Sequence, residues 1–353
     1  MPEFDLAVIG AGILGAVSAY LACQQQPEWR VLLLDRSLVG DGATQYSAGL
    51  DIPYGRNARQ KHYSTISTGI YRDLKASIPE LPIYQIPLFS VVAKDKEKGL
   101  CSGFTTEGIR PATKPELAQL HKSYPGLAIP EDQIVLTGCM AHYAFPVQVA
   151  QLLVRRLKET GRAECWEGVE IDGVQPTGEG FKLATNDGRN ISARRVLVAT
   201  GPWLLDGPAS EFARNAGVRI KKVAALHINR PPAPQDPVII FFDEDAFLLP
   251  VVQRREWIFS FTSEEWDCVP EVSRLRISKA DRELALKILD RYCPSFVHDC
   301  HGGRVFCDAY TPDRIPLVAQ VADVPNFVVA GACSGSGYRL APGIGVEALS
   351  KLA

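Results

Sequence analysis

The stretch Phe4–Asp35, FDLAVIGAGILGAVSAYLACQQQPEWRVLLLD, decides the fold class of this chain. FDLAVIG and WRVLLLD are short apolar runs, typical of strands buried on both faces, and ILGAVSAYLACQQ between them has the apolar spacing of a helix. Gly10, Gly12 and Gly15 stand in the G-x-G-x-x-G spacing where the first run meets the helical segment. The stretch therefore predicts a βαβ unit of the Rossmann type.

The same stretch predicts a dinucleotide-binding site. Glycines at this spacing allow a tight turn, backbone approach to a pyrophosphate and close helix packing, while the helix N-terminus supplies N–H donors. Asp35 ends the second run, where a carboxylate accepts hydrogen bonds from an adenosine ribose. Asp35 suits the free 2'-hydroxyl of FAD or NAD better than NADP, although Arg36 follows it. The alternative is a glycine-rich βα turn that only packs tightly.

Composition narrows the class of protein. The 353 residues are 46% hydrophobic and 22% charged, with a net charge of -2, which suits one large or two moderate globular domains and gives no basic field for nucleic acid. The nine cysteines form an odd set without a Cys-x-x-Cys pair, so we expect reduced thiols and no metal site. The N-terminus lacks the pattern of a signal peptide, and no apolar run approaches the length of a membrane span. We therefore expect a cytoplasmic protein without a transmembrane segment.

The rest of the chain predicts two domains. Residues 146–160 have the pattern of an amphipathic helix, and residues 167–203 that of short strands separated by TGEG and NDGR turns. Residues 218–261 are strand-like and interrupted by prolines, as in a larger antiparallel sheet, and residues 278–294 predict a helix stopped by Pro294. We predict an α/β protein: a Rossmann-type dinucleotide-binding domain interrupted by an α+β domain with an antiparallel sheet that binds substrate. The first comprises 1–80, 142–212 and 300–353, and the second 81–141 and 213–299.

Three further stretches resemble motifs of one known family. They are GDGATQYSAGL (40–50), RRVLVATGPW (194–203), and TPDRIPLV (311–318) followed by NFVVAGACSGSGYRLAPGIG (326–345). Together with the first stretch, and in the same order, they resemble the D-amino acid oxidase family of FAD-dependent oxidoreductases, with its glycine oxidase and monomeric sarcosine oxidase branches. The resemblance covers both ends of the chain and residues 142–203.

The resemblance implies FAD bound across two domains. The substrate would lie against the flavin, and a hydride would pass to flavin N5 from a carbon that carries nitrogen, leaving an imine. Covalent members attach FAD through a cysteine before the Thr-Pro-Asp motif, but Cys307 lies one residue closer to the aspartate than that pattern, so we expect noncovalent FAD. The expected cofactor-binding residues are Gly10, Gly12, Ile13, Leu14, Gly15, Asp35, Arg36, Gly42, Ala43, Thr44, Ser47, Ala48, Gly49, Leu50, Val169, Thr200, Gly201, Trp203, Gly335, Gly337, Tyr338, Arg339 and Leu340.

The resemblance also indicates which residues bind substrate. Arg339 occupies the place where the sarcosine oxidase branch has a lysine that binds the substrate carboxylate, and Arg56 falls near that branch's second carboxylate-binding arginine. The alternatives are a structural pairing for Arg339 and a solvated loop charge for Arg56. Arg304 resembles the carboxylate-binding arginine of glycine oxidase, but the spacing is too long and the matching position holds Asp308. Tyr310 and Tyr338 line the pocket or only pack.

The expected activity is FAD-dependent oxidation of a small amine or amino acid, with oxygen or another electron acceptor. The oxygen-activating lysine of the sarcosine oxidase branch would fall at Ile258, so a dehydrogenase competes with an oxidase. His62 and His227 are expected to be solvated or core histidines. The alternatives are oxidation of a 2-hydroxy acid, which the same arginine would anchor, and a noncatalytic flavoprotein subunit that needs a partner protein. A NAD-binding module is disfavoured, because it does not need the C-terminal glycine motif.

Overall fold

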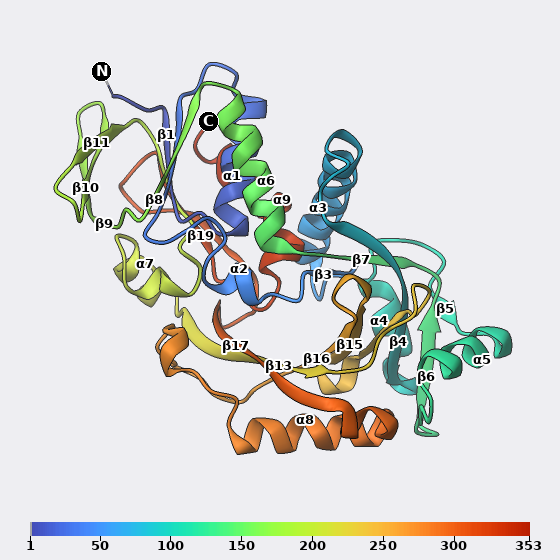
Figure 1. The fold of residues 1–353 in the computed structure, drawn as a ribbon. Coiled ribbons are helices and arrows are strands. Elements are labelled where there is room, and N and C mark those ends of the chain that lie inside the picture. The colour runs from blue at the N-terminus through green and yellow to red at the C-terminus, as the bar shows by residue number, and fades with distance from the viewer. Residues whose placement is uncertain (1) are drawn as a thin grey trace.

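The computed structural model describes residues 2–353, and residue 1 of the predicted first domain lies outside them. The dinucleotide-binding domain is built on a six-stranded sheet of order β18-β19-β12-β1-β2-β8, in which only the edge strand β18 runs antiparallel to its neighbour (Figure 1). Its strands are β1 (Leu6–Ile9), β2 (Val31–Asp35), β8 (Ala163–Glu167), β12 (Val196–Val198), β18 (Leu317–Gln320) and β19 (Phe327–Gly331). The predicted βαβ unit is confirmed, with a helix at Ile13–Gln25.

Helices and a small sheet cover the two faces of the six-stranded sheet. One face packs against α1 (Ile13–Gln25), α3 (Ala58–Ser77), α6 (Pro146–Glu159) and α9 (Gly337–Ser350), whose apolar side chains form one core with it (Figure 1). The other face packs against α7 (Ser210–Asn215) and a three-stranded antiparallel sheet of β9 (Ile171–Thr177), β10 (Gly180–Thr185) and β11 (Asn190–Ala193). The turns between these strands fall at the predicted TGEG and NDGR segments.

The second domain is built on a large sheet of order β17-β13-β16-β15-β14-β4-β6-β5. Its strands are β4 (Ile83–Ala93), β5 (Arg110–Pro111), β6 (Gln133–Thr137), β13 (Arg219–Ile228), β14 (Val238–Phe241), β15 (Ala246–Val251), β16 (Glu256–Phe261) and β17 (Cys300–Tyr310), with β3 (Leu50–Asp51) and β7 (Met140–Ala144) attached beside β4. The sheet is mixed rather than antiparallel throughout, because β14 and β4 pair in parallel.

Further helices complete the second domain. The predicted helix at residues 278–294 forms α8 (Lys279–Tyr292), which begins at a Ser278 capping box and packs on the sheet face that points away from the first domain (Figure 1). The other helical elements are α2 (Ala43–Tyr46), α4 (Glu97–Gly103), α5 (Lys114–Ser123), η1 (Lys94–Lys96), η2 (Gly201–Leu205), η3 (Phe242–Glu244), η4 (Val252–Arg254), η5 (Val272–Arg274) and η6 (Pro294–Asp299).

Strand β17 changes the expected domain boundary. The sequence predicts residues 300–310 in the dinucleotide-binding domain, but they form the edge strand of the large sheet, where they pair with β13 along its whole length. The chain enters the first domain again only after Tyr310. Strand β17 thereby brings side chains of the large sheet directly beside the dinucleotide-binding domain.

The C-terminal helix begins earlier than the sequence suggests. The glycine-rich run predicts a loop at Tyr338 and Arg339 and a helix that starts with the segment APGIGVEALSKL at Ala341, but α9 begins at Gly337 and contains Pro342. A proline at this position has no N–H to donate to the carbonyl of Tyr338, four residues earlier. The Tyr71 hydroxyl donates to that carbonyl instead, at 2.6 Å. Arg339 consequently projects from the first turn of a helix rather than from a loop.

Candidate active site

Two adjoining cavities lie between the domains. The larger, of about 540 Å³, lies at the carboxyl ends of β1, β2, β12 and β19, where open α/β sheets bind ligands. The smaller, of about 300 Å³, lies between the loop after β2 and the large sheet. The residues that line both cavities are Ile13, Ala43, Thr44, Asp308 and Gly337. A ligand that extends along the first cavity therefore reaches the second.

The glycine motif shapes the floor of the larger cavity. Gly10 has a φ of +105°, and a Cβ there would lie 2.5 Å from the carbonyl oxygen of Ala199. A Cβ on Gly15 would lie 1.8 Å from the carbonyl oxygen of Gly10. Both positions therefore require glycine, because the β1–α1 turn packs backbone against backbone. The turn leaves the N-terminus of α1 facing the cavity, where its N–H groups and dipole favour an anion.

Polar groups along this cavity suit a dinucleotide. The carboxylate of Asp35 accepts hydrogen bonds from the backbone N–H groups of Ala11 at 2.7 Å and Ser37 at 2.8 Å, which fix its position at the end of β2. The hydroxyl oxygen of Thr200 is buried, lines the cavity and has no hydrogen-bond partner in the described part of the chain. The Thr44 hydroxyl accepts the Ile13 N–H at 2.9 Å and so caps the first turn of α1. These groups fit a ligand that carries ribose hydroxyls and phosphates.

Arg36 and Trp203 form the far wall of the same cavity. The Arg36 guanidinium lies 4.5 Å from the centroid of the Trp203 ring, a cation–π contact. A Cβ on Gly42 would lie 2.8 Å from that ring, so the loop after β2 closes tightly over it. Val169 also lines the cavity, and its N–H donates to the carbonyl oxygen of Asp35 at 2.9 Å.

The structure brings together nearly all of the expected cofactor-binding residues. The larger cavity is lined by Gly10, Gly12, Ile13, Leu14, Asp35, Arg36, Gly42, Ala43, Thr44, Val169, Thr200, Gly201, Trp203 and Gly337, and the smaller by Ser47, Ala48, Gly49, Leu50, Gly335, Tyr338 and Arg339. Two expected residues line neither cavity. Gly15 lies beneath Gly10, and Leu340 is fully buried in the core between α9 and its neighbours. They act through packing.

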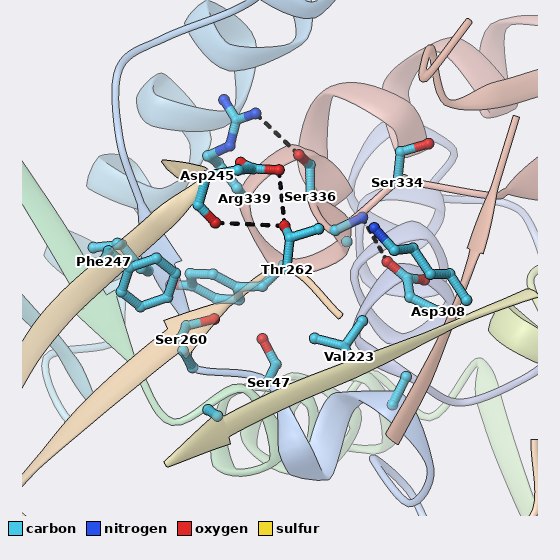
Figure 2. A pocket seen from close by; sticks show the side chains of 18 of the residues that line it. Ser47, Val223, Asp245, Phe247, Ser260, Thr262, Asp308, Ser334, Ser336 and Arg339 are labelled. Atoms are coloured by element: carbon cyan, nitrogen blue, oxygen red, sulfur yellow. Dashed lines mark hydrogen bonds between the residues drawn. The ribbon is translucent and has the colours of Figure 1, made fainter. Parts of the chain in front are cut away.

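Arg339 lies on the wall of the smaller cavity. Its Nη1 donates to the carbonyl of Tyr54 and its Nη2 to the hydroxyl of Ser336 at 3.0 Å. The guanidinium has five N–H donors, so these two bonds hold it in place and leave donors for a ligand. Burial lowers the pKa of Arg339, and the nearby Asp51 carboxylate opposes this shift. Figure 2 shows Arg339 and Asp308 on two sides of the space bounded by Ser260 and Thr262.

A buried polar network supports Arg339 from behind. The side chain of Asp51 is only 3% exposed and lies 3.5 Å from His142 Nδ1, while His142 Nε2 lies 3.1 Å from the Tyr338 hydroxyl. Burial raises the pKa of Asp51 to about 7, and the Arg339 charge opposes this. Burial lowers the pKa of His142 to about 4, so the imidazole is neutral near pH 7. Tyr338 thus belongs to a core network, with its ring stacked on Tyr71 at 4.8 Å and its hydroxyl bound to His142.

The large sheet contributes the opposite wall, including a lysine that the sequence did not single out. On β13, Lys221 is 5% exposed and lines the cavity, and its ammonium lies 5.4 Å from the centroid of the Tyr310 ring. Burial lowers the pKa of Lys221, and the Arg314 charge adds to this. Arg56 also lines the cavity and pairs with Asp245 at 3.0 Å. Tyr310 stands beside Lys221 as part of the wall.

Asp308 lies where the two cavities meet. It is opposite Lys221 in the β13–β17 pairing, and its carboxylate accepts the N–H groups of Ala309 at 2.8 Å and Gly335 at 2.7 Å. Burial raises the pKa of Asp308 to about 6, which these two bonds moderate. Its neighbour Cys307 points to the other side of the strand, into the core, and lines neither cavity.

Other expected features lie elsewhere. Ile258 is buried in the large sheet and lines a third, smaller cavity, whereas Arg304 lines both that cavity and the smaller of the two site cavities. His62 is exposed on α3, and His227 lies on β13 near Glu256. All nine cysteines are free, and residues 2–353 contain no group of three His, Cys, Asp or Glu side chains arranged around a metal ion. In the described part of the chain, no helix has the length and apolar character needed to cross a membrane.

The Rossmann-type domain, the glycine turn and the adjoining cavity define a dinucleotide-binding protein. The model of the FAD dependent oxidoreductase (DAO) family matches residues 5–350. The chain therefore belongs to this family, its cofactor is FAD, and the fit of the larger cavity to a dinucleotide agrees with that assignment. No curated protein sequence matches the chain.

Solved structures share the fold at low sequence identity. Glycine oxidase from Geobacillus kaustophilus is 16% identical with a TM-score of 0.76, covering 100% of this chain and 95% of that one. L-proline dehydrogenase from P. horikoshii is 19% identical with a TM-score of 0.79, covering 98% and 92%. L-alpha-glycerophosphate oxidase from Mycoplasma pneumoniae, with FAD bound, is 15% identical with a TM-score of 0.79, covering 100% and 95%.

Proposed function

We propose that this enzyme oxidises the C–N bond of a small amine or amino acid that carries a carboxylate, releasing an imine. One observation carries the proposal: the cavity that adjoins the FAD site is small, and the cationic side chains that line it, among them Arg56, Lys221 and Arg339, outnumber the carboxylates of Asp245 and Asp308. FAD supplies the hydride acceptor. The protein has to bind the substrate, orient its reacting carbon and keep water out.

Arg339 is the proposed carboxylate anchor. Its free donors suit a carboxylate, because a guanidinium offers two parallel N–H groups to two oxygens. The bonds to Tyr54 and Ser336 fix the guanidinium before substrate arrives, so little conformational entropy is lost on binding. Lys221 on the large sheet and Arg56 on the loop before α3 add positive charge to the cavity wall, which favours an anionic substrate over a neutral amine.

Asp308 is the proposed partner of the substrate nitrogen. It lies where the two cavities meet, which is where a molecule in the smaller cavity comes nearest to one in the larger. Its oxygens are held by two backbone N–H groups and keep lone pairs for a third donor. A carboxylate at this point and a guanidinium at Arg339 would bind the two ends of an amino acid in one orientation.

The proposal includes noncovalent FAD, an electron acceptor that is oxygen or another oxidant, and a cytoplasmic location. Noncovalent FAD is supported by Cys307, whose side chain faces the core rather than the cavities. The sarcosine oxidase branch activates oxygen with a lysine, and Ile258 takes that position here. The proposed electron acceptor is therefore either oxygen or another oxidant. A cytoplasmic location is supported by nine free cysteines, which are typical of a reducing compartment.

Oxidation of a 2-hydroxy acid or hydroxy phosphate is the second candidate, because the same cationic wall would bind its acid group and a glycerophosphate oxidase shares the fold. Mixing the FAD-loaded enzyme anaerobically with matched amino, N-methyl amino and 2-hydroxy acids tests both. We expect an amino acid to bleach the flavin absorbance, and readmitted oxygen to show whether it reoxidises the flavin quickly. Bleaching by the hydroxy acid alone would favour the second candidate. A colourless protein that takes up no FAD would contradict both.

A further inference from the structure

A third cavity, of about 210 Å³, lies beyond the smaller of the two site cavities. Its walls come from Ser47 and Ala48 of the loop after β2, from residues 143–148, and from the large sheet at Val251 and Ile258. Arg304 on β17 lines both this cavity and the proposed substrate cavity, so its side chain forms part of the partition between them.

The Arg304 guanidinium is only partly satisfied. Its Nη1 donates to the carbonyl oxygens of Tyr46 and Ser47, each at 3.2 Å. Its Nε and Nη2 are buried and have no acceptor among residues 2–353. These two nitrogens lie on one edge of the guanidinium, the edge that binds both oxygens of a planar oxyanion through parallel N–H donors. Burying an N–H donor without an acceptor costs free energy, so a ligand that accepts from this edge would be stabilised there.

The charges around Arg304 leave one positive charge without a partner. Arg254 lines the same cavity and packs over the Phe145 ring at 4.7 Å. The carboxylate of Glu256 opposes these positive charges at Arg304, and it lies 3.5 Å from His227 Nδ1. Burial lowers the pKa of His227, so the imidazole adds no charge near pH 7. Burial and the Arg254 charge lower the pKa of Arg304 to about 10, which still leaves it protonated. Two guanidinium charges thus face one carboxylate.

We propose that this cavity binds a monovalent planar oxyanion, of the class of formate, nitrate or bicarbonate, on the Nε and Nη2 edge of Arg304. Arg254 supplies the second positive charge at the cavity mouth. The site is separate from the proposed substrate anchor at Arg339. A bound anion would hold Arg304 in the orientation that binds the Tyr46 and Ser47 carbonyls, and would thereby stabilise the loop that lines the proposed flavin site.

Thermal unfolding of the FAD-loaded enzyme tests the site. Chloride is replaced stepwise by formate or nitrate at constant ionic strength, and the melting temperature is followed by tryptophan fluorescence. The wild type should show a saturable rise of about 2 °C at ten times the dissociation constant. Arg304→Met should abolish the rise. Arg255→Met, which removes an exposed neighbouring charge, should leave it unchanged.

A second variant keeps the proposal testable if Arg304→Met does not fold. Arg304→Lys retains the charge but lacks the planar edge, so it should respond equally to formate and chloride, whereas the wild type should prefer formate. A wild-type protein with no saturable response would overturn the proposal, because water alone would then satisfy Arg304. An undiminished response in Arg304→Met, or no preference for planar anions in the wild type, would overturn it equally.

Discussion

Replacement of Asp51 by asparagine should remove the pH dependence of stability that comes from this buried carboxyl group. The pKa of Asp51 rises from 3.8 to about 7 because the side chain is buried. The folded protein therefore binds a proton more tightly at this site than the unfolded chain does. The stabilisation is complete below about pH 4 and is lost as the pH rises through 7. Between pH 5 and pH 8 the wild type should lose about 2.5 kcal/mol of unfolding free energy at this site.

Urea unfolding at these two pH values measures the effect. The wild type should lose about 2.5 kcal/mol more than Asp51→Asn on going from pH 5 to pH 8, because asparagine does not titrate. Asp73→Asn is the matched control, since the Asp73 side chain is 71% exposed and pairs only with the adjacent Arg72. Equal losses in the wild type and Asp51→Asn would refute the assignment of a proton to buried Asp51.

Three further predictions concern the cofactor and substrate sites. Gly15→Ala should weaken FAD binding by more than about tenfold in a flavin fluorescence titration, because the new Cβ would collide with the Gly10 carbonyl. Gly69→Ala is the control and should bind FAD normally, because a Cβ there would have no atom within 4 Å. Lys221→Met should raise the KM for an anionic substrate by about tenfold without changing the flavin spectrum, and an unchanged KM would exclude Lys221 from substrate binding. Acid precipitation should release all of the yellow colour into the supernatant; colour retained in the pellet would point to a covalent link.

The first βαβ unit could be predicted because its signals are local. The apolar runs, the glycine spacing and Asp35 all lie within Phe4–Asp35, and each has its structural consequence within that stretch. The start of α9 could not be predicted in this way. Its proline is tolerated because the Tyr71 hydroxyl supplies the missing donor from more than 250 positions away in the sequence. The sequence around Pro342 therefore gives no sign that a helix can include this proline.

The residues that line the proposed substrate cavity were also harder to predict, because contacts between distant parts of the chain place them there. Lys221 becomes a cavity residue only because β13 pairs with β17, which sets it opposite Asp308. Surface lysines and buried ones look alike in a sequence, and only the pairing distinguishes them. Arg339 was found because the family motif fixes its place, while its partners Tyr54 and Asp51 lie in a segment that carries no comparable pattern. The place of β17 in the second domain could not be predicted either, because its partner strand β13 lies far away in sequence.

Anaerobic flavin reduction shows whether Arg339 anchors a carboxylate beside the flavin. The FAD-loaded wild type and Arg339→Met are each mixed with a substrate amino acid found by the screen and with its amide, which lacks the negative charge. We expect the wild type to reduce its flavin with the acid at least about a hundredfold more efficiently than with the amide, and Arg339→Met to stay yellow but lose this preference. An equal preference for the acid in both proteins would contradict this role of Arg339.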